Sequence, residues 1–297
     1  MTDFVRISMN TLFVFGLGYS ACALAGRLMA RGWSVRGTTR DEGNLDALAR
    51  GGIEGFVFDG DAPLADPAAA LDGVTHLLSS VPPGPDGDPV LVHHGSDIAD
   101  RAGNLAWGGY LSTTGVYGDR GGDWVDENSD LRPATERGER RVAAEARWCA
   151  LWREHGLPVH LFRLAGIYGP GRNALATVRS GRAQRIVKPG QVFSRIHVDD
   201  IAAVLEASIA RPNPGAAYNL CDDDPAPPQK VIAHACALLG VEPPPEIPFE
   251  DAELSDMARS FYAESKRVSN TRIKDELGVE LAYPDYRAGL AALLSEI

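Results

Sequence analysis

Residues 11–21 read TLFVFGLGYSA, and they are the strongest indication of the fold in the sequence. Its first five residues are apolar or β-branched, which is typical of a buried parallel strand. A glycine turn follows, and residues 23–31 then read as a helix that closes at Gly32. The next strand, residues 34–39, arrives at the interval that a βαβ unit requires. The stretch therefore predicts a Rossmann-type unit that binds a dinucleotide.

The turn itself matches the G-x-G-x-x-A fingerprint. Gly16 permits the tight turn, Gly18 lets the main chain approach a pyrophosphate, and Ala21 keeps the helix close to the strand. Main-chain N–H groups at the helix start, at Tyr19 and Ser20, then face the phosphates with the help of the helix dipole. The alternative is a glycine turn in an α/β core that binds no ligand.

The end of the second strand bears on the choice of cofactor. A carboxylate at this place accepts hydrogen bonds from the adenosine ribose and repels a 2′-phosphate. The sequence has Thr39 and Arg40 instead, a pair suited to the 2′-phosphate of NADP, so we expect NADP in preference to NAD. Asp41 and Glu42 follow immediately and weaken this preference, and a solvated loop position for Arg40 is the alternative.

Further apolar runs follow at similar intervals, and polar residues end them. They span residues 53–58 with Asp59 next, 74–80 with Ser79 and Ser80 at the end, 110–112 and 158–164. The alternation predicts an α/β fold with a Rossmann-type doubly wound parallel sheet, whose ligands bind beyond the carboxyl ends of the strands. We expect an NAD(P)-binding domain at residues 9–165 and an interleaved substrate-binding or lid region at 166–297. Residues 1–8 form an upstream extension in this interpretation.

The charge and the cysteines bound the range of functions. The 297-residue chain carries 29 Lys and Arg against 40 Asp and Glu, a net charge of −11. This argues against nucleic acid or a membrane surface as a partner, because both bind through clustered basic residues. The four cysteines form neither a disulfide framework nor a metal site. Residues 7–26 are uncharged like a signal peptide, but no basic segment precedes them and glycines break the run, so we expect a cytoplasmic protein.

Further motifs extend along nearly the whole chain. Residues 112–118 read STTGVYG, Arg163 precedes a glycine-containing IYGPG, and RIHVDD lies at residues 195–200. Together with the glycine turn, Asp59 and the AYNL of residues 217–220, these segments resemble the extended short-chain dehydrogenase/reductase family of NAD(P)-dependent epimerases and dehydratases. The resemblance implies that Asp59 holds the adenine amino group.

The resemblance also implies that Thr113 contacts the reacting oxygen of the substrate and that a Tyr-x-x-x-Lys pair carries the acid/base chemistry. Aligning residues 143–145 with the family's Ala-Ala-Glu puts Arg137 at the Tyr position and Arg141 at the Lys position. An arginine does not donate a proton near neutral pH, although Arg141 can still bind ribose or phosphate. The chain therefore resembles the atypical branch of the family, which lacks this pair.

Two functional interpretations follow. In one, the chain is an oxidoreductase or epimerase acting on a small polar substrate, a nucleotide sugar or another anion, and Tyr117 or a bound water moves the proton. In the other, the chain binds NADP(H) without catalysis and acts as a redox sensor. A ring packed beneath the loop is the alternative to the catalytic role of Tyr117. The chain is expected to be a monomer or a homodimer.

The region after residue 165 is rich in Gly, Pro and Arg. In the family it builds a lid over the substrate, so Arg172 and Arg195 are expected to offer guanidinium groups to a phosphate or carboxylate, with solvated loop charge as the alternative. Asp199 and Asp200 precede an apolar helix and are interpreted as helix-start residues. Residues 222–224 are interpreted as an acidic turn, so no metal site is predicted.

Overall fold

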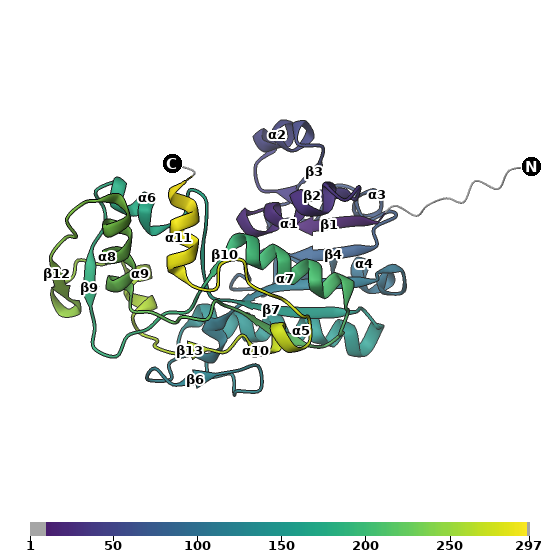
Figure 1. The fold of residues 1–297 in the computed structure, drawn as a ribbon. Helices are drawn as coiled ribbons and strands as arrows, with labels where there is room; N and C mark the ends of the chain where they lie inside the picture. Colours follow the sequence, from purple (N-terminus) through teal and green to yellow (C-terminus); the bar gives the residue numbers. More distant parts are fainter. Residues whose placement is uncertain (1–9, 296–297) are drawn as a thin grey trace, which may run out of the picture. The chain divides into compact units, whose positions relative to one another are not determined.

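A computed structural model describes residues 10–295, apart from the side chain of Met257. The main element is a seven-stranded sheet in the order β11-β7-β5-β4-β1-β2-β3 (Figure 1). Its strands are β1 (Thr11–Phe15), β2 (Ser34–Thr39), β3 (Glu54–Val57), β4 (His76–Ser79), β5 (Trp107–Thr113), β7 (Val159–Leu164) and β11 (Ala217–Leu220). This confirms the Rossmann-type α/β fold. The upstream extension predicted at residues 1–8 lies outside the described residues.

The helices and the short strands complete the fold. The helices are α1 (Tyr19–Met29), α2 (Leu45–Arg50), α3 (Pro67–Ala70), α4 (Pro89–Asp100), α5 (Glu136–His155), α6 (Ala174–Arg179), α7 (Val198–Ala210), α8 (Pro228–Leu239), α9 (Asp256–Phe261), α10 (Thr271–Asp275) and α11 (Tyr286–Leu294). Three parallel pairs of short strands are β6 (Trp124–Val125) with β13 (Arg267–Val268), β8 (Gly166–Tyr168) with β10 (Arg195–His197), and β9 (Arg185–Val187) with β12 (Glu246–Pro248). No helix between residues 10 and 295 is long and apolar enough to cross a membrane.

The chain divides into two compact units built from interleaved segments. Of the described residues, the first unit contains 10–111, 144–161 and 212–216, and the second contains 112–143, 162–211 and 217–295. Strands β5 and β7 begin in the first unit and end in the second. The domain boundary predicted between residues 165 and 166 stays a prediction. Each unit is described by itself below.

The first unit packs around β1, whose five residues are all buried. β1 pairs in parallel with β2 on one side and with β4 on the other. Asp88 caps α4 by accepting hydrogen bonds from Val90 N and Leu91 N, and its second oxygen accepts one from Trp148 Nε1 at 2.9 Å. This buried carboxylate therefore ties α4 to α5.

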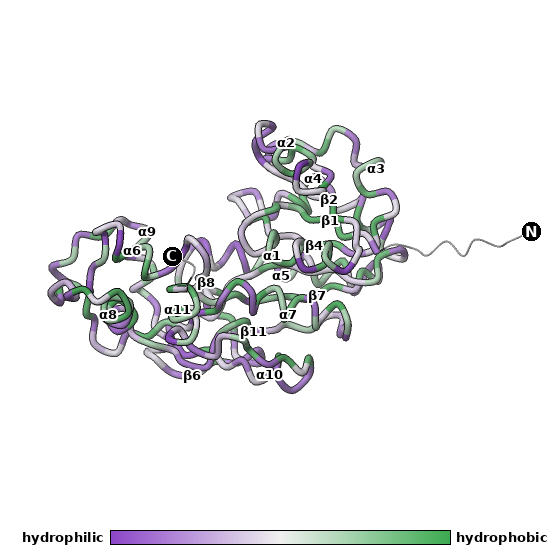
Figure 2. The backbone as a smooth tube through the Cα atoms, turned by 45° about the horizontal axis from the view of Figure 1, so that its top comes forward, coloured by the Kyte–Doolittle hydropathy of each residue, from purple (hydrophilic) through white to green (hydrophobic). Residues whose placement is uncertain are grey.

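The second unit holds several smaller apolar clusters. One joins α6, α8 and α11 through Leu175, Ala235 and Leu290, all of which are at most 1% exposed. Another lies around Val116 and Tyr117, just after β5. Figure 2 shows hydrophobic residues along β7 and along α7, in agreement with the buried side chains of both elements.

Two predicted boundaries differ from the structure by three or more residues. Helix α1 begins at Tyr19 rather than at residue 23, because Gly18 already serves as its N-cap. Strand β5 begins at Trp107 rather than at residue 110. Glycines disfavour strands, so Gly108 and Gly109 masked its start, but Gly109 leaves room for the Trp107 ring.

Candidate functional site

The glycine turn after β1 is held tightly by its neighbours. Gly16 has φ +81°, a conformation that L side chains rarely adopt, and its N–H donates to Thr38 Oγ1 at 2.8 Å. Leu17 N donates to Thr38 O at 2.9 Å, and the Ser80 hydroxyl donates to Gly16 O. The turn is therefore fixed against the ends of β2 and β4, as the fingerprint requires.

The start of α1 is open toward solvent on the side of Gly18. A Cβ built on Gly18 meets no atom within 4 Å, and no side chain of the described residues caps the helix there. The first turn carries no acidic residue. Ala21 is 1% exposed, which brings α1 close to the sheet. Ser20 is buried and Tyr19 exposed, so the predicted loop residues form an N-terminal end suited to an anion.

Ser79 provides an independent observation at the same place. It is the last residue of β4 and lies opposite Phe15, the residue directly before the glycine turn. Its side chain is fully buried, and the hydroxyl has no hydrogen-bond partner among the described residues. Such orphaned buried hydroxyls are uncommon in folded proteins and call for a group that satisfies them.

The residues predicted to select the cofactor lie at the ends of β2 and β3. Arg40 is exposed directly after β2, and the hydroxyl of Thr39 accepts a hydrogen bond from Asn44 Nδ2 at 3.3 Å. Asp59 is exposed after β3, and its Oδ1 accepts from Asp61 N at 2.9 Å. These side chains all belong to the first unit, at the same carboxyl edge of the parallel strands as the glycine turn.

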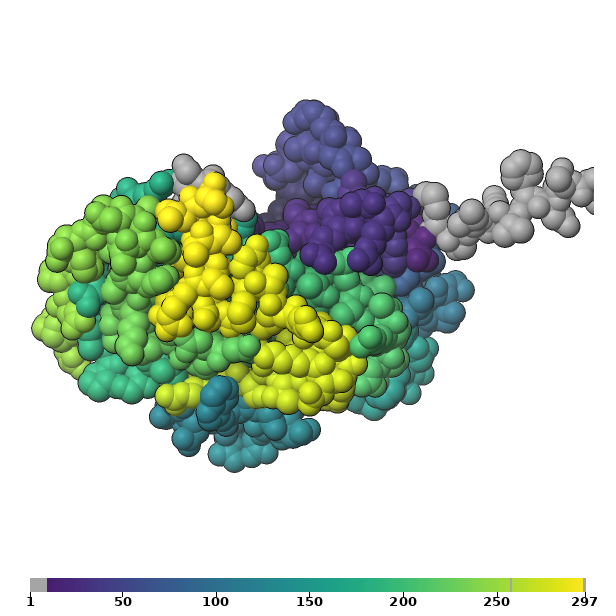
Figure 3. All heavy atoms as spheres, viewed as in Figure 1, coloured from purple at the N-terminus to yellow at the C-terminus, as the bar shows by residue number. Residues whose placement is uncertain are grey.

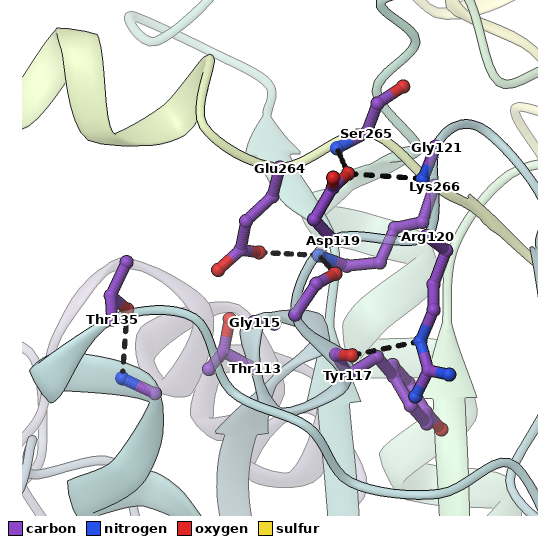
Figure 4. Close-up of polar contacts among 12 residues, drawn as sticks. Thr113, Gly115, Tyr117, Asp119, Arg120, Gly121, Thr135, Glu264, Ser265 and Lys266 are labelled. Carbon is purple, nitrogen blue, oxygen red and sulfur yellow. Dashed lines mark hydrogen bonds and ion pairs between the residues drawn. The ribbon is translucent and has the colours of Figure 1, made fainter.

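The candidate catalytic residues belong to the second unit, at the end of β5 (Figure 4). Thr113 is half-buried, and its Oγ1 accepts from Gly115 N at 3.2 Å. The loop ends at Gly118, where φ is +69° and a Cβ would lie 1.8 Å from Arg132 O. Only glycine fits there. The sequence motif STTGVYG thus encodes a rigid turn that presents Thr113.

Tyr117 lies beneath this loop and is fully buried. Its hydroxyl donates to Asn219 Oδ1 at 2.7 Å and accepts from Arg163 Nη1 at 2.9 Å. Burial raises the pKa of Tyr117 to about 12, although Arg163 and Asn219 offset part of that effect. Of the two alternatives for Tyr117, this environment favours the packed ring.

Helix α5 begins beside the same loop and carries Arg137 and Arg141, the two arginines that the sequence alignment puts at the Tyr and Lys positions. A Cβ on Gly138 would lie 3.1 Å from Gly115 O, so the helix start approaches the loop closely. Arg137 is exposed, with its guanidinium 5.7 Å from the centre of the Phe261 ring. Arg141 is half-buried one turn further along. Only Arg141 therefore has a partly enclosed environment.

An ionisable pair beside the loop was missed in the sequence. Lys266 is 8% exposed, and its ammonium donates to Gly118 O at 2.8 Å and to Glu264 Oε2 at 2.5 Å. Figure 4 shows the Glu264 carboxylate pointing toward the end of β5, where Thr113 lies. Asp119 Oδ1 accepts from Ser265 N at 2.8 Å, a bond that lowers the pKa of Asp119 and fixes the segment. No motif in the sequence around Lys266 indicated this pair.

The predicted substrate arginines differ from each other. Arg172 is exposed. Arg195 is half-buried, and its Nη1 donates to Phe193 O at 2.8 Å and to Ala226 O at 3.0 Å. It lines a pocket of about 300 Å³ with the aromatic rings of Tyr168 and Tyr286.

The acidic pairs have structural roles. Asp199 lies in the first turn of α7, as expected, whereas Asp200 is buried and accepts hydrogen bonds from Ala282 N and Tyr283 N. Asp222 departs from the predicted acidic turn, because it is 1% exposed. Within residues 10–295, no group of three or more His, Cys, Asp or Glu side chains is arranged to hold a metal ion.

Comparison with known proteins shows the relatives of this chain. The protein YeeZ of Escherichia coli strain K12 is 30% identical over 291 residues, which cover 93% of this chain and 97% of YeeZ. A structure from Silicibacter pomeroyi, described as that of a functionally unknown conserved protein, is 53% identical with a TM-score of 0.89, over 97% of this chain and 99% of that one. No family model matches the sequence.

More distant structures share the fold. The UDP-glucuronic acid 4-epimerase of Bacillus cereus in complex with NAD has a TM-score of 0.76 at 15% identity, over 96% of both chains. The TM-score shows a common Rossmann-type architecture, and at this low sequence identity the similarity concerns the fold alone.

Proposed function

The chain belongs to the family of the Escherichia coli protein YeeZ, and we propose that it binds a nicotinamide dinucleotide at the glycine turn of its first unit. The observation that carries the proposal is the buried, unpartnered hydroxyl of Ser79 beside that turn. An unsatisfied buried hydroxyl costs free energy that a bound polar group can recover. The epimerase structures of the same fold, which contain NAD, support the same site.

The residues of the first unit fit this group. Main-chain N–H groups of residues 19–21 hold the pyrophosphate, and Asp59 accepts from the adenine amino group. Arg40, with the hydroxyl of Thr39, binds the 2′-phosphate, so NADP is preferred over NAD. Ser79 and Ser80 close the site at the end of β4.

Titration with NADPH and NADH, followed by nicotinamide fluorescence, tests the cofactor proposal. Gly18→Ala places a methyl group where nothing in the protein lies within 4 Å, so the variant folds and loses affinity only if a ligand approaches there. Gly26→Ala is the matched control, because it adds the same methyl group at another open position on α1. Equal affinities in both variants, or no binding by the unaltered chain, contradict the proposal.

We propose further that the chain is an oxidoreductase or epimerase for a small polar substrate. A bound nicotinamide supplies hydride exchange with a substrate carbon. The hydroxyl of Thr113 holds the reacting oxygen, and Arg141 binds a ribose or phosphate group. Support comes from the rigid loop that presents Thr113 and from the partly enclosed position of Arg141.

The proton-transfer group is proposed to be the Glu264–Lys266 pair rather than Tyr117. Tyr117 has no exposed surface, and both Arg163 and Asn219 already engage its hydroxyl, so it serves as a positioning residue for the loop. Glu264 keeps one carboxylate oxygen beyond its bond to Lys266 and points toward the end of β5. This gives the second unit an ionisable pair beside the loop that carries Thr113, although the alignment finds no Tyr-x-x-x-Lys pair.

Steady-state kinetics with NADPH and a panel of carbonyl and nucleotide-sugar substrates tests the reaction. Thr113→Ala and Glu264→Gln are each expected to lower kcat by roughly 100-fold or more, the usual scale for losing a general acid or base, while NADPH affinity stays unchanged. Glu250→Gln, an exposed glutamate on the short 3₁₀ helix Phe249–Asp251, is the control. Unaltered kcat and pH profile in Glu264→Gln remove this residue from the mechanism.

A further inference from the structure

The second unit contains a pocket of about 300 Å³ between α6, α8 and α11. Figure 3 shows α11, in yellow, on the surface of this unit beside the green segment that includes α8. The lining side chains are mainly apolar, with a single charged residue among them. They are Tyr168, Ala174, Thr177, Gln184, Arg195, Pro228, Val231, Ile232, Tyr286 and Leu290.

Arg195 is fixed in one orientation by main-chain contacts. Both of its side-chain hydrogen bonds to the described residues come from Nη1, which donates to Phe193 O at 2.8 Å and to Ala226 O at 3.0 Å. No acceptor among the described residues bonds to Nε or Nη2, and neither atom is fully buried. The Nε–Nη2 edge is the edge that binds the two oxygens of a carboxylate side by side.

The charge of Arg195 is not neutralised by its acidic neighbours. Among the acidic side chains, Asp222 has the strongest electrostatic interaction with Arg195. Burial raises the pKa of Asp222 to about 8, so this carboxyl is mostly uncharged near pH 7. Asp224 is engaged with Arg287, whose Nη1 donates to it at 2.7 Å. The two lining tyrosines have pKa values raised by burial and stay neutral. A cation thus faces a mainly apolar pocket without a bound counter-charge.

We propose that this pocket binds a small organic monoanion: a carboxylate held by the Nε–Nη2 edge of Arg195, with a compact apolar body between Val231 and Leu290. A nucleoside diphosphate sugar carries two phosphates, a nucleobase and two sugar rings, whereas this pocket offers one cation. Its volume of about 300 Å³ lies at the lower end of the range for ligand sites, about 300 to 1,000 Å³. This inference deepens the proposed function by naming a class of substrate. It rests on that function only in taking the bound anion to be the substrate.

Calorimetric titration with cyclohexanecarboxylate and with cyclohexylmethanol at pH 7 tests the proposal. The two probes have nearly the same size, and only the first is charged. The acid is expected to bind at least about tenfold more tightly, the scale of a hydrogen-bonded charge pair. Equal binding of acid and alcohol, or no binding of either probe, overturns the proposal.

Variants locate the site. Arg195→Met is expected to abolish the difference between acid and alcohol, whereas Arg179→Met, which removes an exposed arginine of α6 that does not line the pocket, leaves it intact. Because Arg195 also holds two carbonyl groups, Thr177→Trp provides a second test by filling the pocket without touching that anchor, and it is expected to weaken both probes. Retained acid binding in a folded Arg195→Met or in Thr177→Trp overturns the assignment.

Two further measurements separate this inference from the proposed function. If UDP-glucuronic acid displaces the carboxylate and binds more tightly through Arg195, the small-monoanion class is wrong. NADPH titration of the same preparations reports on the first unit alone. Normal NADPH binding without acid binding overturns only the pocket, and acid binding without NADPH binding overturns only the cofactor proposal.

Discussion

Replacing Asp222 by asparagine is expected to stabilise the protein increasingly as the pH rises from about 4 to about 8. Asp222 is 1% exposed, and neither of its carboxyl oxygens forms a well-shaped hydrogen bond with the described residues. Burial is the main cause of its raised pKa, while the guanidinium of Arg195 and nearby main-chain groups lower it only in part. Asparagine has the same shape as the protonated acid and never ionises.

The sign and the size follow from the shift in pKa. The folded chain keeps a proton on Asp222 up to about pH 8, whereas the unfolded chain releases it near its ordinary value of 3.8. The free energy of unfolding therefore keeps its full contribution from this group below about pH 4, and it falls as the pH rises to 8. Between pH 5 and pH 8 the free energy of unfolding falls by about 1.36 kcal/mol per pH unit, or about 4 kcal/mol in all. Local relaxation of the folded chain reduces this loss toward about 2 kcal/mol.

Thermal unfolding of both proteins at several pH values is the assay. At roughly 2 °C per kcal/mol for a chain of this size, Asp222→Asn gains about 4 to 8 °C in Tm over the unaltered chain between pH 5 and pH 8. Asp46→Asn, at an exposed position on α2, is the control that leaves the buried carboxyl in place. A difference in Tm that stays constant across this range refutes the reasoning, because it means that Asp222 is ionised in the folded chain.

Three further predictions concern the two candidate sites and the loop. Arg40→Ala is expected to lower the affinity for NADPH by about tenfold or more with little change for NADH, as measured by fluorescence titration; equal losses for both contradict a 2′-phosphate contact. Tyr117→Phe is expected to lower the free energy of unfolding by about 1 to 3 kcal/mol, since buried partners lose their hydrogen bond, and a denaturant titration beside NADPH binding checks this. Gly118→Ala is expected to prevent folding because its methyl group overlaps Arg132 O, whereas Gly121→Ala adds the same strain at φ +58° without a clash and still folds, as circular dichroism of both variants shows.

The sequence predicts the first half of the sheet well because its signals are local. β1 and β2 have the bounds read from the sequence, since each is a short buried run that ends at a turn or polar residue. The glycine turn needs its particular residues at particular places, and Gly16 shows the positive φ expected of a tight turn. The fold and the outline of the cofactor loop could therefore be predicted from neighbouring residues alone.

The second unit could not be predicted in the same way because its contacts join distant segments. The partner of Lys266 is the carbonyl of Gly118, 148 residues away in the chain, and nothing in the polar stretch around Lys266 indicates burial. Asp222 resembled an exposed acidic turn for the same reason. Its burial depends on β10, whose Arg195 O accepts a hydrogen bond from the main-chain N–H of Asp222 at 2.6 Å.

Arg137 on α5 and the buried pair Glu264–Lys266 are linked through Phe261, which Arg137 contacts and which shortly precedes the pair in the chain. The catalytic tyrosine and lysine of the related fold belong to the helix that begins against the loop after β5. In this chain the sequence alignment puts Arg137 at the tyrosine position. Arg137 is exposed and faces Phe261, and the segment that follows Phe261 brings Lys266 to the carbonyl of Gly118. The ammonium of Lys266 therefore reaches the same loop from a segment late in the chain. It comes together with a carboxylate, a group of the kind that serves as a general acid or base, which an arginine does not. On this argument an arginine predicted at the tyrosine position does not by itself indicate a lost reaction, and the kinetics of Glu264→Gln decide between a relocated acid/base group and a binding protein.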